Sequence, residues 1–99
     1  MRENAGYKII KGILLPHCEF VLGEKQSTSG TQYVTWRCVN FTDYYYGHYT
    51  ESLKSATRDL YERAKEEIEF ILNQMENLNN ENYRENQPHR SRCYQSLRL

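Results

Sequence analysis

Alternating apolar and polar residues predict short strands in the first half of the chain. The clearest alternation is QYVTWRCV, in which Val34, Trp36 and Cys38 point to one side of a strand and the intervening side chains to the other. Strands are predicted over four segments, 7–15, 18–23, 32–39 and 44–49. Short intervening segments make a three- or four-stranded antiparallel meander the expected sheet.

Glycine, proline and polar clusters mark the predicted interruptions. Gly12 inside the first strand suggests a β-bulge, and Pro16 ends that strand because proline has no N–H to donate. Residues 23–30, GEKQSTSG, have the composition of a polar loop, and residues 40–43 that of a turn.

A single long amphipathic helix is predicted after the strands. Thr50 or Ser52 can cap its first turn by accepting a hydrogen bond from a free backbone N–H. The apolar positions recur at spacings of three and four, at Leu53, Ala56, Leu60, Ala64, Ile68, Ile71, Met75 and Leu78. The pattern weakens over 77–87, and Pro88 prevents any continuation.

These elements predict an α+β fold in which the sheet and the helix shelter each other from water. We expect the Val34–Trp36 face to pack on the Leu60–Ile68 stripe, with Trp36 at the junction and no enclosed pocket. Burial of the indole would stabilise the fold by about 3 kcal/mol. The expected organisation is one domain over residues 1–83 and a basic C-terminal tail over 84–99.

The charge distribution is uneven although the formal net charge is zero. Residues 51–81 carry eight acids and four bases, whereas residues 84–99 carry four arginines and one glutamate. A uniformly basic nucleic-acid binder is therefore disfavoured, and an acidic helix beside a basic tail suits contact with a charged protein surface. Solvation of the helix would also explain the acidic residues.

The sequence predicts a cytoplasmic protein. No stretch reaches the roughly 18 apolar residues of a membrane-spanning helix, and the N-terminal residues do not resemble a signal peptide. Cys18, Cys38 and Cys93 are accordingly expected as reduced thiols.

No set of residues predicts an enzyme. Cys38 and His48 would be neighbours if their strands pair, but Cys38 shares a register with Trp36, which favours an inert core thiol. His48 lies among aromatic residues and is expected to form a structural hydrogen bond. A glycine-rich phosphate loop is not found either.

The alternative to a cofactor-free protein is a structural zinc site. His17 and Cys18 are adjacent, and His89 and Cys93 stand four apart near the end of the chain. Imidazole nitrogen and thiolate sulfur are the ligands that zinc prefers, and two such pairs would close a tetrahedral site. Cys38 or His48 could replace one member, although the spacings match no established zinc motif.

Tyrosine and arginine residues on the last two strands predict a partner-binding surface, since both residue types are enriched at binding hot spots. Ordinary cross-strand packing is the competing interpretation. Together with acidic residues of the helix, the predicted partner-binding residues are Tyr33, Arg37, Tyr44, Tyr46, Glu62, Glu66 and Glu69.

The order of motifs resembles that of small proteins carried by phages, plasmids and conjugative elements of Gram-positive bacteria. The resemblance covers roughly residues 7–70. The matching residues are EFVLGE (19–24), YVTW (33–36), YYYGHY (44–49) and the helix positions Ala56, Asp59, Leu60 and Arg63. It implies an anti-CRISPR protein that binds the type II CRISPR effector nuclease and blocks DNA loading or cleavage. The PHC segment (16–18) and the basic tail are outside the shared pattern, and no residue role transfers.

Two other functions remain open. An accessory protein of conjugative transfer or replication would contact DNA through the arginine-rich residues 84–99. An enzyme would depend on Cys38 or His48. An exposed strand edge and the apolar residues Met75 and Leu78 also permit a homodimer.

Overall fold

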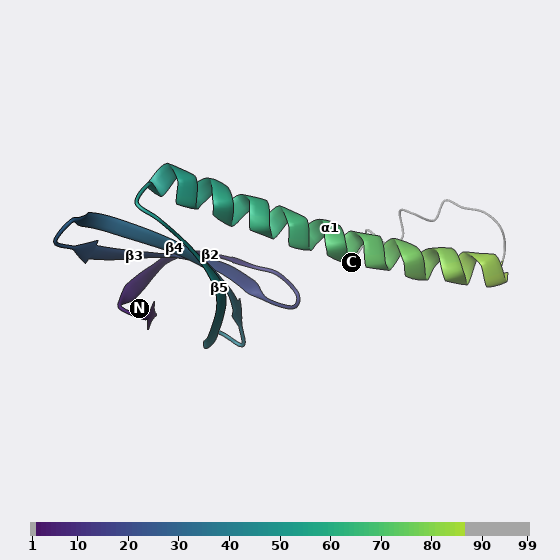
Figure 1. Cartoon of the computed structure of the whole chain (residues 1–99). Coiled ribbons are helices and arrows are strands. Elements are labelled where there is room, and N and C mark those ends of the chain that lie inside the picture. Colours follow the sequence, from purple (N-terminus) through teal and green to yellow (C-terminus); the bar gives the residue numbers. More distant parts are fainter. Residues whose placement is uncertain (1, 87–99) are drawn as a thin grey trace. The chain divides into compact units, whose positions relative to one another are not determined.

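The computed structural model describes the backbone of residues 2–86 and the side chains of residues 2–77. Five strands form one antiparallel meander in the order β1-β2-β3-β4-β5, and helix α1 follows them (Figure 1). The elements are β1 (Glu3–Asn4), β2 (Tyr7–Leu14), β3 (Glu19–Ser27), β4 (Gly30–Val39), β5 (Asp43–Thr50) and α1 (Leu53–Asn86). The predicted α+β class is confirmed, but the sheet has five strands because the two-residue β1 is too short to leave a pattern.

The β3–β4 hairpin extends further than predicted. Pairing continues to Ser27 and Gly30, so most of the predicted loop 23–30 is strand and only residues 28–29 form the turn. The Ser27 hydroxyl donates to the Gly30 carbonyl at 2.7 Å, and Gly30 has a φ of 122°, which glycine adopts without strain. The polar composition reflects the exposed end of a hairpin, where side chains face water on both sides.

A β-bulge interrupts the pairing of each strand that flanks β3 and β4. In β2 the register shifts between Ile9 and Lys11, so Ile10 is the extra residue. In β5 two residues, Tyr46 and Gly47, lie opposite Trp36, since Thr35 pairs with His48 and Arg37 with Tyr45. An extra residue reverses which face the following side chains occupy, and it also increases the local twist. The bulge predicted at Gly12 is therefore at Ile10.

The two faces of the sheet each bury an apolar layer. The helix-side layer comprises Cys18, Phe20 and Leu22 of the sheet with Ala56, Leu60 and Ala64 of α1. The inner layer, on the opposite face, comprises Tyr7, Val21, Val34, Trp36 and Cys38.

Curling of the sheet closes the inner layer without a second helix. Strands β2 and β5 are not neighbours, yet the ring centres of Tyr7 and Tyr49 are 6.1 Å apart. The rings of Tyr7, Tyr44 and Tyr49 all meet Trp36 edge-on, at centre distances of 5.6, 5.4 and 6.4 Å. Such edge-to-face pairs add to the stabilisation from area burial.

The prediction that Trp36 lies between the sheet and the helix is wrong. Trp36 is only 4% exposed, but it is buried in the inner layer together with Val34 and Cys38. The helix packs instead on the face that carries Leu22 and Phe20. Alternation shows which side chains share a face, but with both faces apolar it does not show which face a helix covers. Ile68, predicted on the buried stripe, is exposed.

Helix α1 begins as predicted and continues further. The Ser52 hydroxyl accepts a hydrogen bond from the Ser55 N–H at 3.0 Å, which identifies Ser52 as the N-cap. The helix continues to Asn86, through the segment where the pattern weakens and past the proposed boundary at residue 83.

The chain divides into two compact units at Lys65 and Glu66, so residues 53–65 of α1 belong with the sheet. Within the part of the chain that the structure describes, no helix combines the length and apolarity needed to cross a membrane.

Replacing Gly47 by alanine should destabilise the inner layer. A Cβ atom at Gly47 would lie 2.8 Å from Trp36 Nε1 and 2.9 Å from the Tyr49 ring, and the buried Trp36 ring has no space into which it can move. We expect Gly47→Ala to lower the free energy of unfolding by ~1–3 kcal/mol, measured by urea denaturation. At Gly12 the added Cβ meets only the end of the Glu19 side chain, which can turn away without displacing a buried ring, so Gly12→Ala is the milder control. Equal denaturation midpoints for the two variants would contradict the close packing around Trp36.

Candidate functional site

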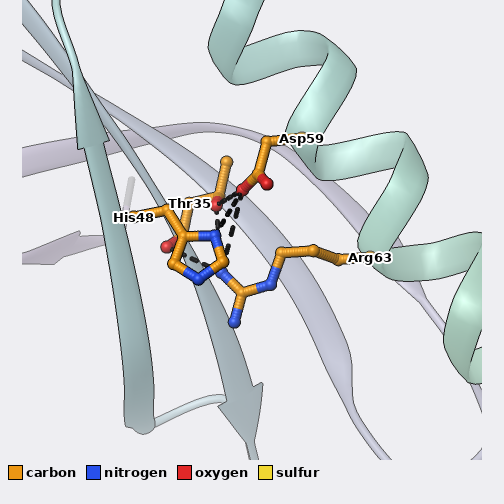
Figure 2. A network of polar contacts seen from close by, with 4 residues as sticks. All are labelled: Thr35, His48, Asp59 and Arg63. Atoms are coloured by element: carbon orange, nitrogen blue, oxygen red, sulfur yellow. Dashed lines mark hydrogen bonds and ion pairs between the residues drawn. The ribbon is translucent and has the colours of Figure 1, made fainter.

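The most connected polar group in the described residues joins helix α1 to the sheet. Thr35 comes from β4, His48 from β5, and Asp59 and Arg63 from neighbouring turns of α1 (Figure 2). The β5 bulge is what turns His48 toward the helix. Without the extra residue, His48 would share a face with Tyr44 and point into the inner layer.

One oxygen of Asp59 and the residue Thr35 accept the hydrogen bonds of this network. Asp59 Oδ2 accepts from the Thr35 hydroxyl at 2.5 Å and lies 2.9 Å from His48 Nδ1, which donates to the carboxylate. Arg63 Nη1 donates to the Thr35 carbonyl at 3.1 Å and to the Thr35 hydroxyl oxygen at 3.0 Å. The Arg63 guanidinium also stands 5.4 Å from the centre of the Phe20 ring. The network therefore fixes the beginning of α1 on β4 and β5.

This geometry suits attachment of the helix better than catalysis. Thr35 is completely buried, and its hydroxyl hydrogen is directed to Asp59 rather than to His48. A nucleophile needs a base that takes its proton and a third group that orients the base. Here Thr35 and His48 are two donors to the same oxygen. The hydrogen bond predicted for His48 is present, with Asp59 as its partner.

Cys38 and His48 lie on opposite faces of the sheet, so the suggested Cys–His pair does not form. Cys38 pairs with Tyr44 and belongs to the inner layer, whereas His48 faces the helix. Burial raises the pKa of the Cys38 thiol, only partly opposed by the charge of Arg2. Burial likewise raises the pKa of the Tyr44 phenol beside it. A thiol with a raised pKa is a poor nucleophile.

A second polar group lies beside the inner layer near Cys38. Both terminal nitrogens of Arg2 donate to Glu19 Oε1, at 3.0 and 2.9 Å, and the guanidinium stands 5.7 Å from the centre of the Phe41 ring. The hydrogen bond to Glu19 raises the pKa of Arg2. Gly12 leaves the space that the Glu19 carboxylate occupies, since an added Cβ would overlap it.

The structure places only half of the predicted zinc ligands. His17 is exposed, whereas Cys18 is buried in the helix-side layer. His89 and Cys93 lie outside the described residues. Among the side chains that the structure describes, those of residues 2–77, no three His, Cys, Asp or Glu form a group that could hold a metal ion.

The predicted partner-binding residues do not form one patch. Tyr33 packs at the helix-side layer, whereas Tyr44 packs at the inner layer. Arg37 is half-buried and pairs with Tyr45, on the face that carries the helix. Tyr46, at the bulge, is 73% exposed with a φ of 55°, and its ring stacks at an angle on Tyr45. Glu62, Glu66 and Glu69 are exposed on α1.

Removing the Asp59 carboxylate should loosen the attachment of the helix. Asp59→Ala leaves the buried Thr35 hydroxyl without its acceptor, and we expect a loss of ~1–3 kcal/mol in the free energy of unfolding. Glu62→Ala on the same helix removes an exposed carboxylate and should change that free energy by less than about 0.5 kcal/mol. Urea denaturation measures both. Equal effects of the two substitutions would show that the network does not stabilise the fold.

The thiol of Cys38 should react slowly while the chain is folded. At pH 8, iodoacetamide should modify Cys38 at least about tenfold more slowly in the native protein than in urea, as read by peptide mass spectrometry. At a pH between the thiol pKa values of the unfolded and folded chains, Cys38 keeps its proton in the folded chain and has lost it in the unfolded chain, because burial raises its pKa. The free energy of unfolding should therefore fall as the pH rises above the ordinary thiol pKa of about 8.5. Equal rates in the two states would contradict its burial.

Comparison with known proteins gives no family. No family model, curated protein or solved structure matches the chain.

Proposed function

We propose that this protein acts by binding another protein, and that the partner is the type II CRISPR effector nuclease. Occupation of the nuclease surface would block DNA loading or cleavage, as the motif resemblance implies. Such an inhibitor needs no catalytic group of its own, only a surface that competes with nucleic acid.

The observation that carries this proposal is the charge of helix α1. Residues 66–83 contain five glutamates and no basic residue, and all of them lie in the helix. At 1.5 Å per residue this stretch is about 27 Å long. Of its described side chains, Glu66, Glu69 and Glu76 are exposed and Glu67 is half-buried. The nucleic-acid channels of RNA-guided nucleases are lined by basic residues. A negatively charged helix has the charge that such a channel attracts.

Exposed apolar side chains in the same stretch supply contact area. Ile68, Phe70 and Leu72 are all exposed, between 37% and 55%, and they follow closely on Glu66, Glu67 and Glu69. Charge complementarity mainly raises the association rate and selects the partner, whereas desolvated apolar and aromatic anchors slow dissociation. The combination supports a stable protein complex rather than simple solvation of the helix.

Reversing two charges in this stretch should abolish inhibition. Glu66→Lys/Glu69→Lys should weaken co-purification with the nuclease and raise the inhibitor concentration for half-maximal inhibition of DNA cleavage by about tenfold or more. Both residues are exposed, so the urea midpoint should stay near that of the wild type. Glu3→Lys/Asp43→Lys is the matched control, because it makes the same change in net charge at exposed positions on the sheet.

Two results would count against the proposal. Equal inhibition by both double variants would remove the acidic helix from the mechanism, and a wild-type protein that never inhibits cleavage would remove the nuclease as its partner. Binding to DNA alone, weakening steeply with salt and lost on deleting residues 84–99, would instead support the DNA-contacting accessory protein.

A further inference from the structure

A small hollow lined by tyrosines lies where β4 begins and β5 ends. Its volume is about 230 Å³, and it is open to solvent. We call it the tyrosine pocket; its lining residues are Tyr7, Gln32, Tyr33, Tyr49, Thr50 and Glu51. The pairing of Tyr33 with Thr50 and of Val34 with Tyr49 brings the two strands together there. The pocket is smaller than the roughly 300–1,000 Å³ of sites that bury drug-sized ligands, so its size suits one side chain.

The lining of the tyrosine pocket is aromatic and acidic. Three of its six residues are tyrosines, Glu51 supplies a carboxylate, and no lysine or arginine belongs to it. Tyr7 is buried and its hydroxyl donates to Gln32 Oε1 at 3.4 Å, whereas Tyr49 is 63% exposed. The faces of aromatic rings attract cations, and a carboxylate close to them adds a charge partner.

One of these rings, that of Tyr7, already has a cation beside it. Lys25 Nζ stands 5.3 Å from the centre of the Tyr7 ring, within the range of a cation–π contact. Lys25 does not line the pocket, and the Tyr33 ring packs at the helix-side layer. The ring of Tyr49 and the Glu51 carboxylate are therefore the remaining attractive groups of the pocket.

We infer that the tyrosine pocket binds an arginine side chain of a partner protein. The flat guanidinium stacks on a tyrosine ring while its N–H groups donate to the Glu51 carboxylate. A lysine ammonium can satisfy the charge but does not offer a plane that stacks. This inference rests on the proposed function for the identity of the partner, since a basic protein surface presents such arginines. The preference for arginine itself rests only on the pocket.

A capped amino acid tests the pocket directly. We would titrate ¹⁵N-labelled protein with N-acetyl-arginine methylamide and follow amide chemical shifts. The expected result is saturable shifts of residues 32–33 and 49–51. The citrulline analogue has nearly the same shape without the charge, and it should bind at least about threefold more weakly, as should the lysine analogue. No shifts in the pocket, or equal affinity for all three compounds, would overturn the inference.

Two variants identify the groups responsible. Glu51→Gln removes the charge at an exposed position and should weaken arginine binding by about two- to fivefold. Glu3→Gln, an exposed carboxylate that does not line the pocket, should leave it unchanged. Tyr49→Leu should weaken binding about threefold by removing a ring, and its amide spectrum shows whether the chain is folded. Wild-type affinity in both pocket variants would contradict the assignment.

The outcome separates this inference from the proposed function. If the protein inhibits the nuclease while the arginine analogue fails to bind, only the assignment of the pocket is wrong. If the analogue binds as expected while the protein neither binds nor inhibits the nuclease, the proposed function is wrong and the pocket serves a different basic partner.

Discussion

The fold depends on two extra residues in the sheet, Ile10 in β2 and one of the pair Tyr46–Gly47 in β5. Both central strands have apolar residues on their two faces, so the flanking strands must supply cover to both layers. Without a bulge, every second side chain of a flanking strand faces the same layer along the whole strand. Such a strand could cover both layers only if each of its faces carried both apolar and polar residues. The bulges solve this problem because the residues before and after them serve different layers. In β2, Tyr7 and Ile9 therefore meet the inner layer, and Ile13 meets the helix-side layer.

The two layers are held by different interactions. The inner layer is closed by aromatic rings around Trp36 and by the glycine that lets the indole approach β5. The helix-side layer combines a narrow apolar contact, with two alanines among its three buried helix residues, and the polar contacts of Asp59 and Arg63. Small side chains let a helix lie close to a sheet but bury little area each. The polar network compensates by fixing the helix at a defined position along β4.

The sequence was a good guide to the elements and a poor one to their packing. The strands around Trp36 and the Ser52 cap follow from local patterns, and both are present. The face that the helix covers does not follow, because QYVTWRCV has apolar residues on both faces of its strand. The bulges left no clear signal either, since Ile10 looks like an ordinary strand residue. The Thr35–Asp59 contact joins residues 24 positions apart, and the only local trace of the network was an acid and an arginine four apart within the apolar stripe.

The bulge in β5 also affects how the sheet can meet other chains. β5 is one of the two edge strands of the sheet, and a straight edge strand is a template on which a strand of another chain can continue the ladder. Tyr46, in a left-handed conformation halfway along β5, breaks the row of N–H and C=O groups into two short pieces. A strand of another chain that pairs with β5 cannot keep its register across that break. Strand addition, the route to fibrous aggregates, is thereby disfavoured at the β5 edge. Contacts between that edge and another chain must be made through side chains.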